Sequence, residues 1–445
     1  MRRITRRGFA VAALGAGSSL LTAGGVAPMG GVAPAGGVAP MGGVAPSGGV
    51  ARREMRGVWL ATVGNLDWPS RTTLTPAEQQ RELRAHFDTF VRCRLNTVFF
   101  QVRPTADALW PSPYEPWTHV LTGRQGRDPG WDPLGFAVRE AHRRGLELHA
   151  WFNPYRVAHH TDPERLAPHH PARRHPEWVV PYGGKLYYNP GLPEVRRFVQ
   201  DAMLDAVKRY PVDGVHFDDY FYPYPIAGKH FDDDDAYAAH GGGFEDRDAW
   251  RRENTDRLVY EMARRLGRVA RSGRGAQGDG RGGPGDGRSE RAAGRRVRFG
   301  VSPFAVWRNQ SADPRGSRTR AGVQTYDDLY ADTRRWVREG WLDYIVPQVY
   351  WPLGTKAADY AELVPWWSRT AEGTGVDLYI GEALYKQGSS GPAAWHDPGE
   401  LSRHLTFARH YPQVGGHVYF SAKEVAGDPA GAMARVVRDH YGRRA

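Results

Sequence analysis

Short apolar segments alternate with amphipathic segments eight times between Met55 and the end of the chain. The apolar segments have the length and composition of β-strands and lie near residues 55–63, 96–103, 147–153, 213–220, 297–304, 343–351, 377–384 and 415–421. The intervening segments have helical periodicity and lie near residues 76–93, 133–144, 193–209, 246–270, 326–339, 357–371, 398–409 and 428–441. Eight such units predict an α/β fold, a (β/α)8 TIM barrel. A doubly wound open sheet is the alternative, but no glycine-rich phosphate motif follows any strand.

In such a barrel, the loops that follow the strands form the catalytic face. Three of these loops are long, at residues 104–131, 154–192 and 221–245, and we expect them to build a wall of the cleft. A Gly, Arg, Ser and Asp-rich stretch at 272–294 is predicted to be a disordered insertion. It follows a helix, so we expect it on the opposite face.

The first residues have the features of an export signal. Residues 1–23 combine a basic start, Arg6-Arg7-Gly8-Phe9 and an apolar run, which predicts a signal peptide of the twin-arginine type. Residues 24–52 repeat Gly-Gly-Val-Ala-Pro and are predicted to be a low-complexity linker. The barrel domain is expected over 53–445. These features predict a secreted, extracellular or cell-wall-associated protein without a membrane span in its mature form.

The net charge of +11 is concentrated outside the predicted barrel core. Residues 1–53 carry six arginines and no acid, and residues 271–296 carry seven arginines and three acids, which leaves only about +1 for the remainder. The sequence therefore gives no basic surface for a nucleic-acid partner. Cys93 is the single cysteine, so an internal disulfide and a cysteine-ligated zinc site are excluded. Aromatic residues make up 12% of the chain, and their faces suit sugar binding.

Side chains alternate along a strand, so the residues that point into the barrel can be predicted. Many of the inward positions near the strand ends are polar. They are Gln101 and Arg103; His149, Trp151 and Asn153; His216, Asp218 and Tyr220; Ser302; Gln348 and Tyr350; His417, Tyr419 and Ser421. Because burial of unpaired polar groups is costly, these residues predict a solvated, ligand-facing site.

Asp218 and Asp219 close the fourth strand and are the predicted catalytic pair. Two adjacent carboxylates in a cleft do not both ionise easily, so one can keep a proton for a leaving oxygen. Asp219 could instead point outward. Glu382 is a weaker candidate acid at the end of the seventh strand, where it shares the outward parity of Leu378 and Ile380.

Other acids are assigned lesser roles. Asp67 and Asp107 could hold sugar hydroxyls, and 232–235 is an acidic run that lacks the ligand spacing of a calcium loop. We interpret that run as solvated loop acids, and no cofactor is predicted.

Long motifs resemble a known family. They are Arg56-Gly57-Val58-Trp59, Phe100-Gln101-Val102-Arg103-Pro104, Glu147 to Arg156, Tyr188-Asn189-Pro190-Gly191, Asp213 to Pro223, Phe299 to Phe304, Asp343 to Trp351 and Tyr379-Ile380-Gly381. From about Arg53 to Lys423 the chain resembles the glycosyl-hydrolase-like family ten. The resemblance implies a barrel glycosidase of the bacterial surface, whose relatives are thought to cut peptidoglycan strands freed of peptides. The fourth strand is also loosely similar to chitinase-type barrels, but Tyr220 stands where their catalytic Glu would be.

The resulting hypothesis is a glycoside hydrolase acting on an N-acetylated envelope polysaccharide such as peptide-free peptidoglycan. Asp218 would orient the acetamido group or act as the principal carboxylate, and Asp219 would be the acid/base. The expected sugar platforms are Trp151, Tyr350 and Trp351, and the expected polar contacts are Arg103, His149, Asn153, His216, Tyr220, Asn309 and Gln348. Arg103 matches a muramic carboxylate. Two alternatives are a non-catalytic wall-glycan-binding barrel and a metal-dependent hydrolase with zinc on His149, His216 and Asp218.

Overall fold

The computed structural model describes residues 53–275 and 296–442. They belong to a compact unit that begins at Arg53. The predicted signal peptide and linker lie outside the described residues, as does most of the predicted insertion at 272–294. Its first four residues continue helix α7 (Arg247–Gly275). No helix in the described ranges is long and apolar enough to cross a membrane.

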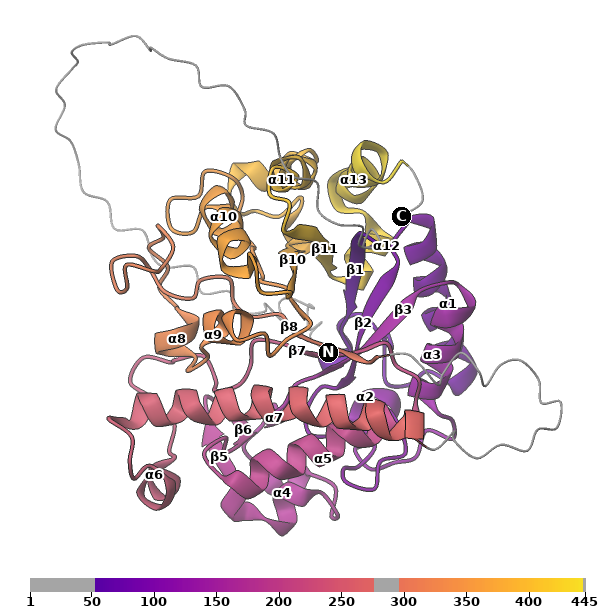
Figure 1. Ribbon diagram of the computed structural model, residues 1–445. Helices are drawn as coiled ribbons and strands as arrows, with labels where there is room; N and C mark the ends of the chain where they lie inside the picture. Colours follow the sequence, from indigo (N-terminus) through magenta and orange to yellow (C-terminus); the bar gives the residue numbers. More distant parts are fainter. Residues whose placement is uncertain (1–52, 276–295, 443–445) are drawn as a thin grey trace, which may run out of the picture. The chain divides into compact units, whose positions relative to one another are not determined.

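Eight parallel strands close into a barrel, which confirms the predicted fold (Figure 1). Around the barrel the order is β1-β11-β10-β9-β8-β7-β3-β2. The strands are β1 (Met55–Leu60), β2 (Thr97–Arg103), β3 (Glu147–Phe152), β7 (Gly214–Phe217), β8 (Arg298–Val301), β9 (Tyr344–Ile345), β10 (Asp377–Glu382) and β11 (Val414–Phe420). Each overlaps one predicted strand.

Helices surround the barrel and bury apolar faces against it. They are α1 (Pro76–Arg92), α3 (Pro133–Arg143), α5 (Pro193–Arg209), α7, α8 (Thr325–Asp328), α9 (Thr333–Arg338), α10 (Tyr360–Ala371), α11 (Glu400–Ala408), α12 (Ala422–Gly427) and α13 (Ala432–His440). Figure 1 shows α7 as the longest of them, with α5 beside it. Helix α1 begins as predicted from Thr75-Pro76, with a capping box between Thr75 and Glu78.

The long loops after the strands contain small regular elements. The loop after β3 carries an antiparallel sheet of order β4-β6-β5, formed by β4 (Arg156–Ala158), β5 (Val179–Tyr182) and β6 (Lys185–Tyr188). Short helices occupy the same face, namely α2 (His119–Thr122), α4 (Pro171–Arg174) and α6 (Asp234–His240). Hydrogen-bonded elements therefore fix the long loops in position.

Aromatic rings fill the barrel interior. Trp59, Phe99, Tyr344 and Val418 are buried there in one cluster with other apolar residues. The strands make room for rings at glycines: a Cβ on Gly300 would lie 2.2 Å from the ring of Tyr344. The interior below the site is thus a packed layer rather than a channel.

Three local predictions were wrong. The predicted helix at 326–339 is two short helices, α8 and α9, because Tyr330 between them has a φ of 52°. The predicted strand at 343–351 is regular only over Tyr344–Ile345. On β11, Val418 points inward, and Tyr419 points outward, where its hydroxyl contacts that of Tyr441 at 2.7 Å. A register shift between β10 and β11 accounts for this inverted parity.

Candidate active site

Asp218 lies directly after β7, at the carboxyl end of the barrel strands, and is held by N–H groups. Trp151 Nε1 donates to Asp218 Oδ2 at 3.1 Å, and Asn153 Nδ2 lies 3.1 Å from both carboxylate oxygens. The backbone N–H of Tyr220 donates to Oδ1 at 3.1 Å. All of these partners are donors, so they favour the ionised carboxylate.

Asp219 has a different set of partners. The hydroxyl of Tyr224 donates to Oδ2, and Gln348 Nε2 donates to Oδ1 at 3.2 Å. Gln348 Nε2 also donates to the carbonyl of Ser302 at 2.8 Å, which fixes its orientation. A hydroxyl can also accept a hydrogen bond, so Tyr224 is compatible with a protonated Asp219.

Both carboxyl groups are more than nine-tenths buried, with exposed fractions of 4% for Asp218 and 8% for Asp219. Burial raises the pKa of Asp218 to about 6, with a further increase from the neighbouring charge of Asp219. Burial also raises the pKa of Asp219. The pair is therefore poised to carry a proton close to neutral pH, as acid–base chemistry requires.

Arg156, at the start of β4, is a member of the site that was not predicted from the sequence. Its guanidinium lies 4.4 Å from the ring centre of Tyr220, and its charge lowers the pKa of both Asp218 and Asp219. Asn153 Oδ1 accepts from the Arg156 backbone N–H at 2.9 Å. Arg156 Nε is buried without a hydrogen-bond partner. The sequence signal that could have identified Arg156 as a site residue is its place in the run Asn153-Pro154-Tyr155-Arg156, directly after a strand.

Aromatic residues surround the carboxylate pair. The rings of Tyr220 and Tyr224 are 5.5 Å apart, and the charge of Asp219 raises the pKa of Tyr350, although burial is the larger cause. Trp351 packs edge-on against Phe304, with ring centres 5.4 Å apart. Tyr220, Tyr350 and Trp351 are all partly exposed, so part of each ring can be reached from solvent. Trp151 is 7% exposed and mainly positions Asp218.

His149 and His216 do not lie at the ligand-facing surface, contrary to prediction. Both side chains are fully buried in the barrel interior, where Tyr344 Oη lies 2.8 Å from His149 Nδ1 and 3.2 Å from His216 Nδ1. His216 Nε2 contacts Ser302 Oγ at 2.9 Å. Burial lowers the pKa of both imidazoles, so they are neutral core groups.

The same geometry contradicts the zinc hypothesis. Within residues 53–275 and 296–442, the three proposed ligands His149, His216 and Asp218 do not bring their donor atoms together. Each of them is hydrogen-bonded to other side chains instead.

Arg103 and Asn309 are also committed to the protein rather than to a ligand. Arg103 is fully buried and forms a two-pronged ion pair with Glu115, with both N···O distances 2.6 Å, and it donates to the carbonyls of Asn153 and Pro154. Asn309 donates to the carbonyl of Ala321 at 3.0 Å and accepts from Thr319 at 2.8 Å. Neither side chain has a free polar group for a sugar, which corrects both predictions.

Glu382 is not a catalytic acid in this structure, because it points away from the cleft. It is fully buried, and its carboxylate contacts Tyr360 Oη at 2.9 Å, His404 Nδ1 at 2.8 Å and His417 Nδ1 at 3.0 Å. Burial opposes ionisation, but His404 and His417 outweigh it and lower the pKa of Glu382 to about 2. His417 was predicted to point inward and instead belongs to this network behind the barrel.

Replacement of Glu382 by Gln is expected to destabilise the fold by about 1.5–3 kcal/mol, the usual range for a hydrogen bond to a charged group, and to change kcat less than threefold. The carboxylate's contribution is present above its ordinary pKa of 4.5 and is lost as the pH falls towards 2. Glu382 raises the pKa of His404, although burial alone would lower it. The stability that protonated His404 contributes is therefore present below its ordinary pKa of 6.5 and is lost as the pH rises through the raised pKa. The free energies of unfolding of wild type and variant, measured in urea, should therefore differ most between pH 4.5 and pH 6.5. A hundredfold loss of kcat in folded Glu382→Gln would restore a catalytic role.

The remaining acids serve the scaffold. Asp67 accepts from the backbone N–H of Ala61 at 2.7 Å and from Ser421 Oγ at 2.6 Å, which joins the loop after β1 to the end of β11. Burial raises its pKa to about 6. Asp107 is fully buried and accepts from Gln125 Nε2 at 3.1 Å.

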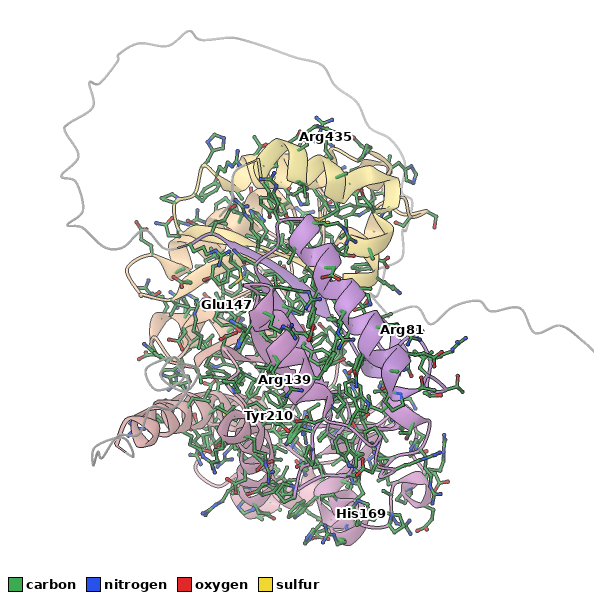
Figure 2. All side chains as sticks on the ribbon, turned by 90° about the vertical axis from the view of Figure 1, so that its right-hand side faces the viewer. Arg81, Arg139, Glu147, His169, Tyr210 and Arg435 are labelled. Atoms are coloured by element: carbon green, nitrogen blue, oxygen red, sulfur yellow. The ribbon has the colours of Figure 1, made fainter. Side chains whose placement is uncertain are left out.

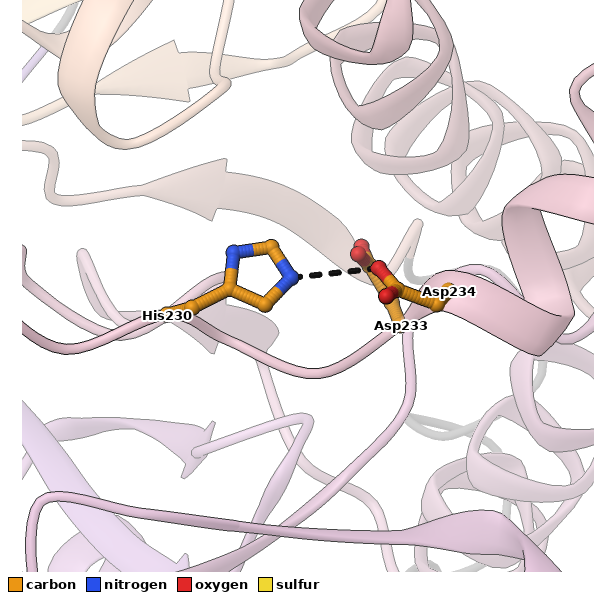
Figure 3. A group of neighbouring side chains, drawn as sticks. All are labelled: His230, Asp233 and Asp234. Carbon is orange, nitrogen blue, oxygen red and sulfur yellow. Dashed lines mark hydrogen bonds and ion pairs between the residues drawn. The ribbon is translucent and has the colours of Figure 1, made fainter.

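The acidic run at 232–235 contributes to the one group in the described residues whose donor atoms could hold a metal ion, His230, Asp233 and Asp234 (Figure 3). Asp233 is only 1% exposed and pairs with Arg251 at 2.6 Å, while Arg247 contacts both Asp233 and Asp234. Two guanidinium groups thus neutralise these carboxylates. Asp233 is a buried ion-pair residue rather than a solvated loop acid, and the other three acids of the run are exposed as predicted.

Comparisons with known proteins bear on the family and on the fold. The family model described as "Glycosyl hydrolase-like 10" matches residues 54–270 and 289–397. Glycosyl hydrolase YngK of Bacillus subtilis strain 168 is 45% identical over 395 residues, which are 88% of this chain and 73% of that protein. Glycosyl hydrolase DigH of Escherichia coli K12 is 40% identical over 387 residues, 82% of each chain. The fold is shared with the PgaB (BpsB) glycoside hydrolase domain of Bordetella bronchiseptica, with a TM-score of 0.56, 15% identity and coverage of 87% of this chain and 98% of that one.

Proposed function

Because the chain belongs to the glycosyl hydrolase-like 10 family, we propose that this glycosidase cleaves N-acetylated glycan strands of the bacterial envelope, with peptide-free peptidoglycan as its substrate. A glycoside hydrolase with a polysaccharide substrate follows from the family itself. The glycan and its peptide-free state are the proposal. Secretion through the predicted signal at 1–23 is part of the same proposal, since the substrate lies outside the cytoplasm.

The observation that carries the proposal is the carboxylate pair, in which two adjacent buried acids have different hydrogen-bond partners. Asp218 receives only N–H donors, and Asp219 receives a hydroxyl and an amide. Glycosidic cleavage needs one group that stabilises the positive charge at the anomeric carbon and one that protonates the leaving oxygen. Only Asp219 has a partner, the Tyr224 hydroxyl, that can also accept a hydrogen bond from a protonated carboxyl, so we assign Asp219 as the proton donor and Asp218 as the anion.

In the proposed mechanism, Asp218 is the anion and Asp219 is the proton donor. Asp219 gives its proton to the glycosidic oxygen as the bond to the anomeric carbon breaks. Asp218 stabilises the developing positive charge, either directly or by orienting the substrate's 2-acetamido oxygen towards that carbon. Water then adds at the anomeric carbon and returns a proton to Asp219. The exposed faces of Tyr220, Tyr350 and Trp351 hold the sugar rings.

Activity should fall as the pH drops through about 6, because the required Asp218 anion takes up a proton there. The raised pKa of a buried acid disfavours the charged folded state, so protonation of Asp218 does not itself unfold the protein. kcat/KM measured across this range, with circular dichroism at each pH, should show lost rate with retained structure. A rate that stays constant well below pH 6 would exclude an ionised Asp218 from the reaction.

The substrate is tested by the release of reducing ends from purified glycans. We expect wild type to cleave peptide-free peptidoglycan strands and to leave the same strands uncut when they retain their peptides or have lost their N-acetyl groups. Cleavage of peptide-bearing strands at an equal rate would contradict the peptide-free assignment. Binding without turnover on every envelope glycan would favour a non-catalytic wall-binding barrel instead.

A further inference from the structure

A cavity of about 940 Å³ lies in the loops after β2 and β3, and its lining does not include the carboxylate pair. Its lining comes from residues 105–127 and 157–173, so two of the three long loops form it. His169, one of the lining residues, lies at the end of the molecule opposite Arg435 in Figure 2. A cavity of this volume can hold a ligand of several hundred cubic ångströms.

The cavity is strongly basic. Arg124, Arg127, Arg165 and Arg173 line it, and Glu164 is its only acidic lining residue. Arg173 pairs with Glu164 at 2.5 Å, whereas the other three guanidinium groups have no carboxylate within 4.0 Å in the part of the chain that the structure describes. Three uncompensated positive charges around one concave space create a field that attracts anions.

Of the histidines that line the cavity, His119 is the one whose positive charge is favoured, because burial lowers the pKa of His159 to about 3 and also lowers that of His160. Asp107 is buried 3.6 Å from His119 Nδ1 and raises the pKa of that imidazole. Thr105 and Gln125 also line the cavity and bond to Asp107, so the wall is fixed. The surface is preformed for a ligand with negative charge and hydrogen-bond acceptors.

Strand β4 connects the cavity to the catalytic carboxylates. Its first residue, Arg156, acts on Asp218, and its next two, Val157 and Ala158, line the cavity. Two residues of strand span about 7 Å. The cavity wall and a side chain that acts on Asp218 therefore belong to one short strand.

We propose that this cavity is a subsite for anionic substituents of the glycan, namely free carboxylates on sugars away from the cleaved bond. The inference rests on the proposed function, since it takes the polymer at Asp218 to be a glycan. Guanidinium groups pair with carboxylates through two parallel hydrogen bonds, and they gain much less from a neutral amide. A carboxylate that carries a peptide is an amide, so the cavity would select strands whose carboxylates are free.

The test removes positive charge and keeps a polar side chain at each position. Arg124→Gln/Arg165→Gln alters the cavity, and Arg81→Gln/Arg139→Gln removes the same charge from exposed positions on α1 and α3 (Figure 2). Calorimetric Kd values are measured for peptide-free glycan strands and for the same strands with their carboxylates converted to methylamides. kcat and KM for cleavage are measured separately.

The cavity variant should bind the carboxylate strands about tenfold more weakly than wild type, the effect of roughly 1.4 kcal/mol, and the control variant should match wild type. Amidated strands should bind wild type and the cavity variant equally, and KM should rise with kcat unchanged. Equal Kd values for carboxylate strands in wild type and cavity variant would overturn the subsite. Tighter binding of poly(glycerol phosphate) than of carboxylate strands would replace the carboxylate with a phosphate ligand and overturn the assignment.

The binding measurement keeps this inference separate from the proposed function. Charge-dependent binding without release of reducing ends would leave the subsite standing and reject the hydrolysis. Release of reducing ends with no difference between wild type and the cavity variant in either Kd or KM would reject the subsite and leave the hydrolysis standing.

Discussion

Asp219→Asn is expected to lower kcat on peptide-free glycan strands by about 10²–10⁴-fold, the usual contribution of a positioned general acid. An amide cannot give a proton to the leaving oxygen, whereas its Oδ1 can still accept from Gln348 and its Nδ2 can donate to the hydroxyl of Tyr224, so KM and folding should change little. Reducing-end assays under saturating substrate measure the loss, and circular dichroism checks the fold.

Asp232→Asn is the matched control, because Asp232 is exposed in the loop after β7 and contacts no part of the pair. Its kcat should equal that of wild type. A folded Asp219→Asn protein that retains more than about one tenth of the wild-type rate would show that Asp219 is not the acid. With an aryl glycoside, whose leaving group needs little protonation, Asp219→Asn is expected to retain more than about one tenth of the wild-type rate, and this would support the assignment.

Glu115→Gln should destabilise the protein by about 3–5 kcal/mol, the range for a buried ion pair that loses one partner. Arg103 and Glu115 have side chains without solvent exposure, so the guanidinium left behind cannot be hydrated. Urea unfolding measures the loss. kcat below the unfolding temperature should fall less than tenfold, because Arg103 supports the backbone at Asn153 and Pro154 and touches no substrate.

The exposed pair Arg318–Glu362 gives the control, since its N···O distance is 3.0 Å and Arg318 is 74% exposed. Glu362→Gln should cost no more than the roughly 0–1 kcal/mol of a surface pair. If Glu115→Gln leaves stability unchanged and raises KM strongly, Arg103 would regain the ligand-binding role predicted from the sequence.

The carboxylate pair could be predicted because its position depends on local pattern. A strand that ends in Asp218-Asp219 must place them at the carboxyl face of a parallel barrel. Gln348 and Asn153 also lie within hydrogen-bonding distance of the pair, as inward parity indicated. Their contacts are to the carboxylates themselves, so they position the acids.

His149, His216, Arg103 and Asn309 could not be assigned correctly from parity. Parity predicts which way a side chain points, but not how deep in the barrel it lies or which residue neutralises it. His149 lies one layer below the site, and the partner of Arg103 comes from a loop twelve residues later. The register shift at β11 reversed the predicted orientation of His417 and Tyr419.

Periodicity and strand ends were sufficient for the barrel, for its catalytic face and for the location of the acidic pair, because each depends on residues close together in the chain. The roles of the polar groups, the unpredicted Arg156 and the basic cavity depended on the folded arrangement. Whether an arginine is a ligand-binding group or a buried scaffold ion depends on the distance to a carboxylate elsewhere in the chain, and folding alone fixes that distance.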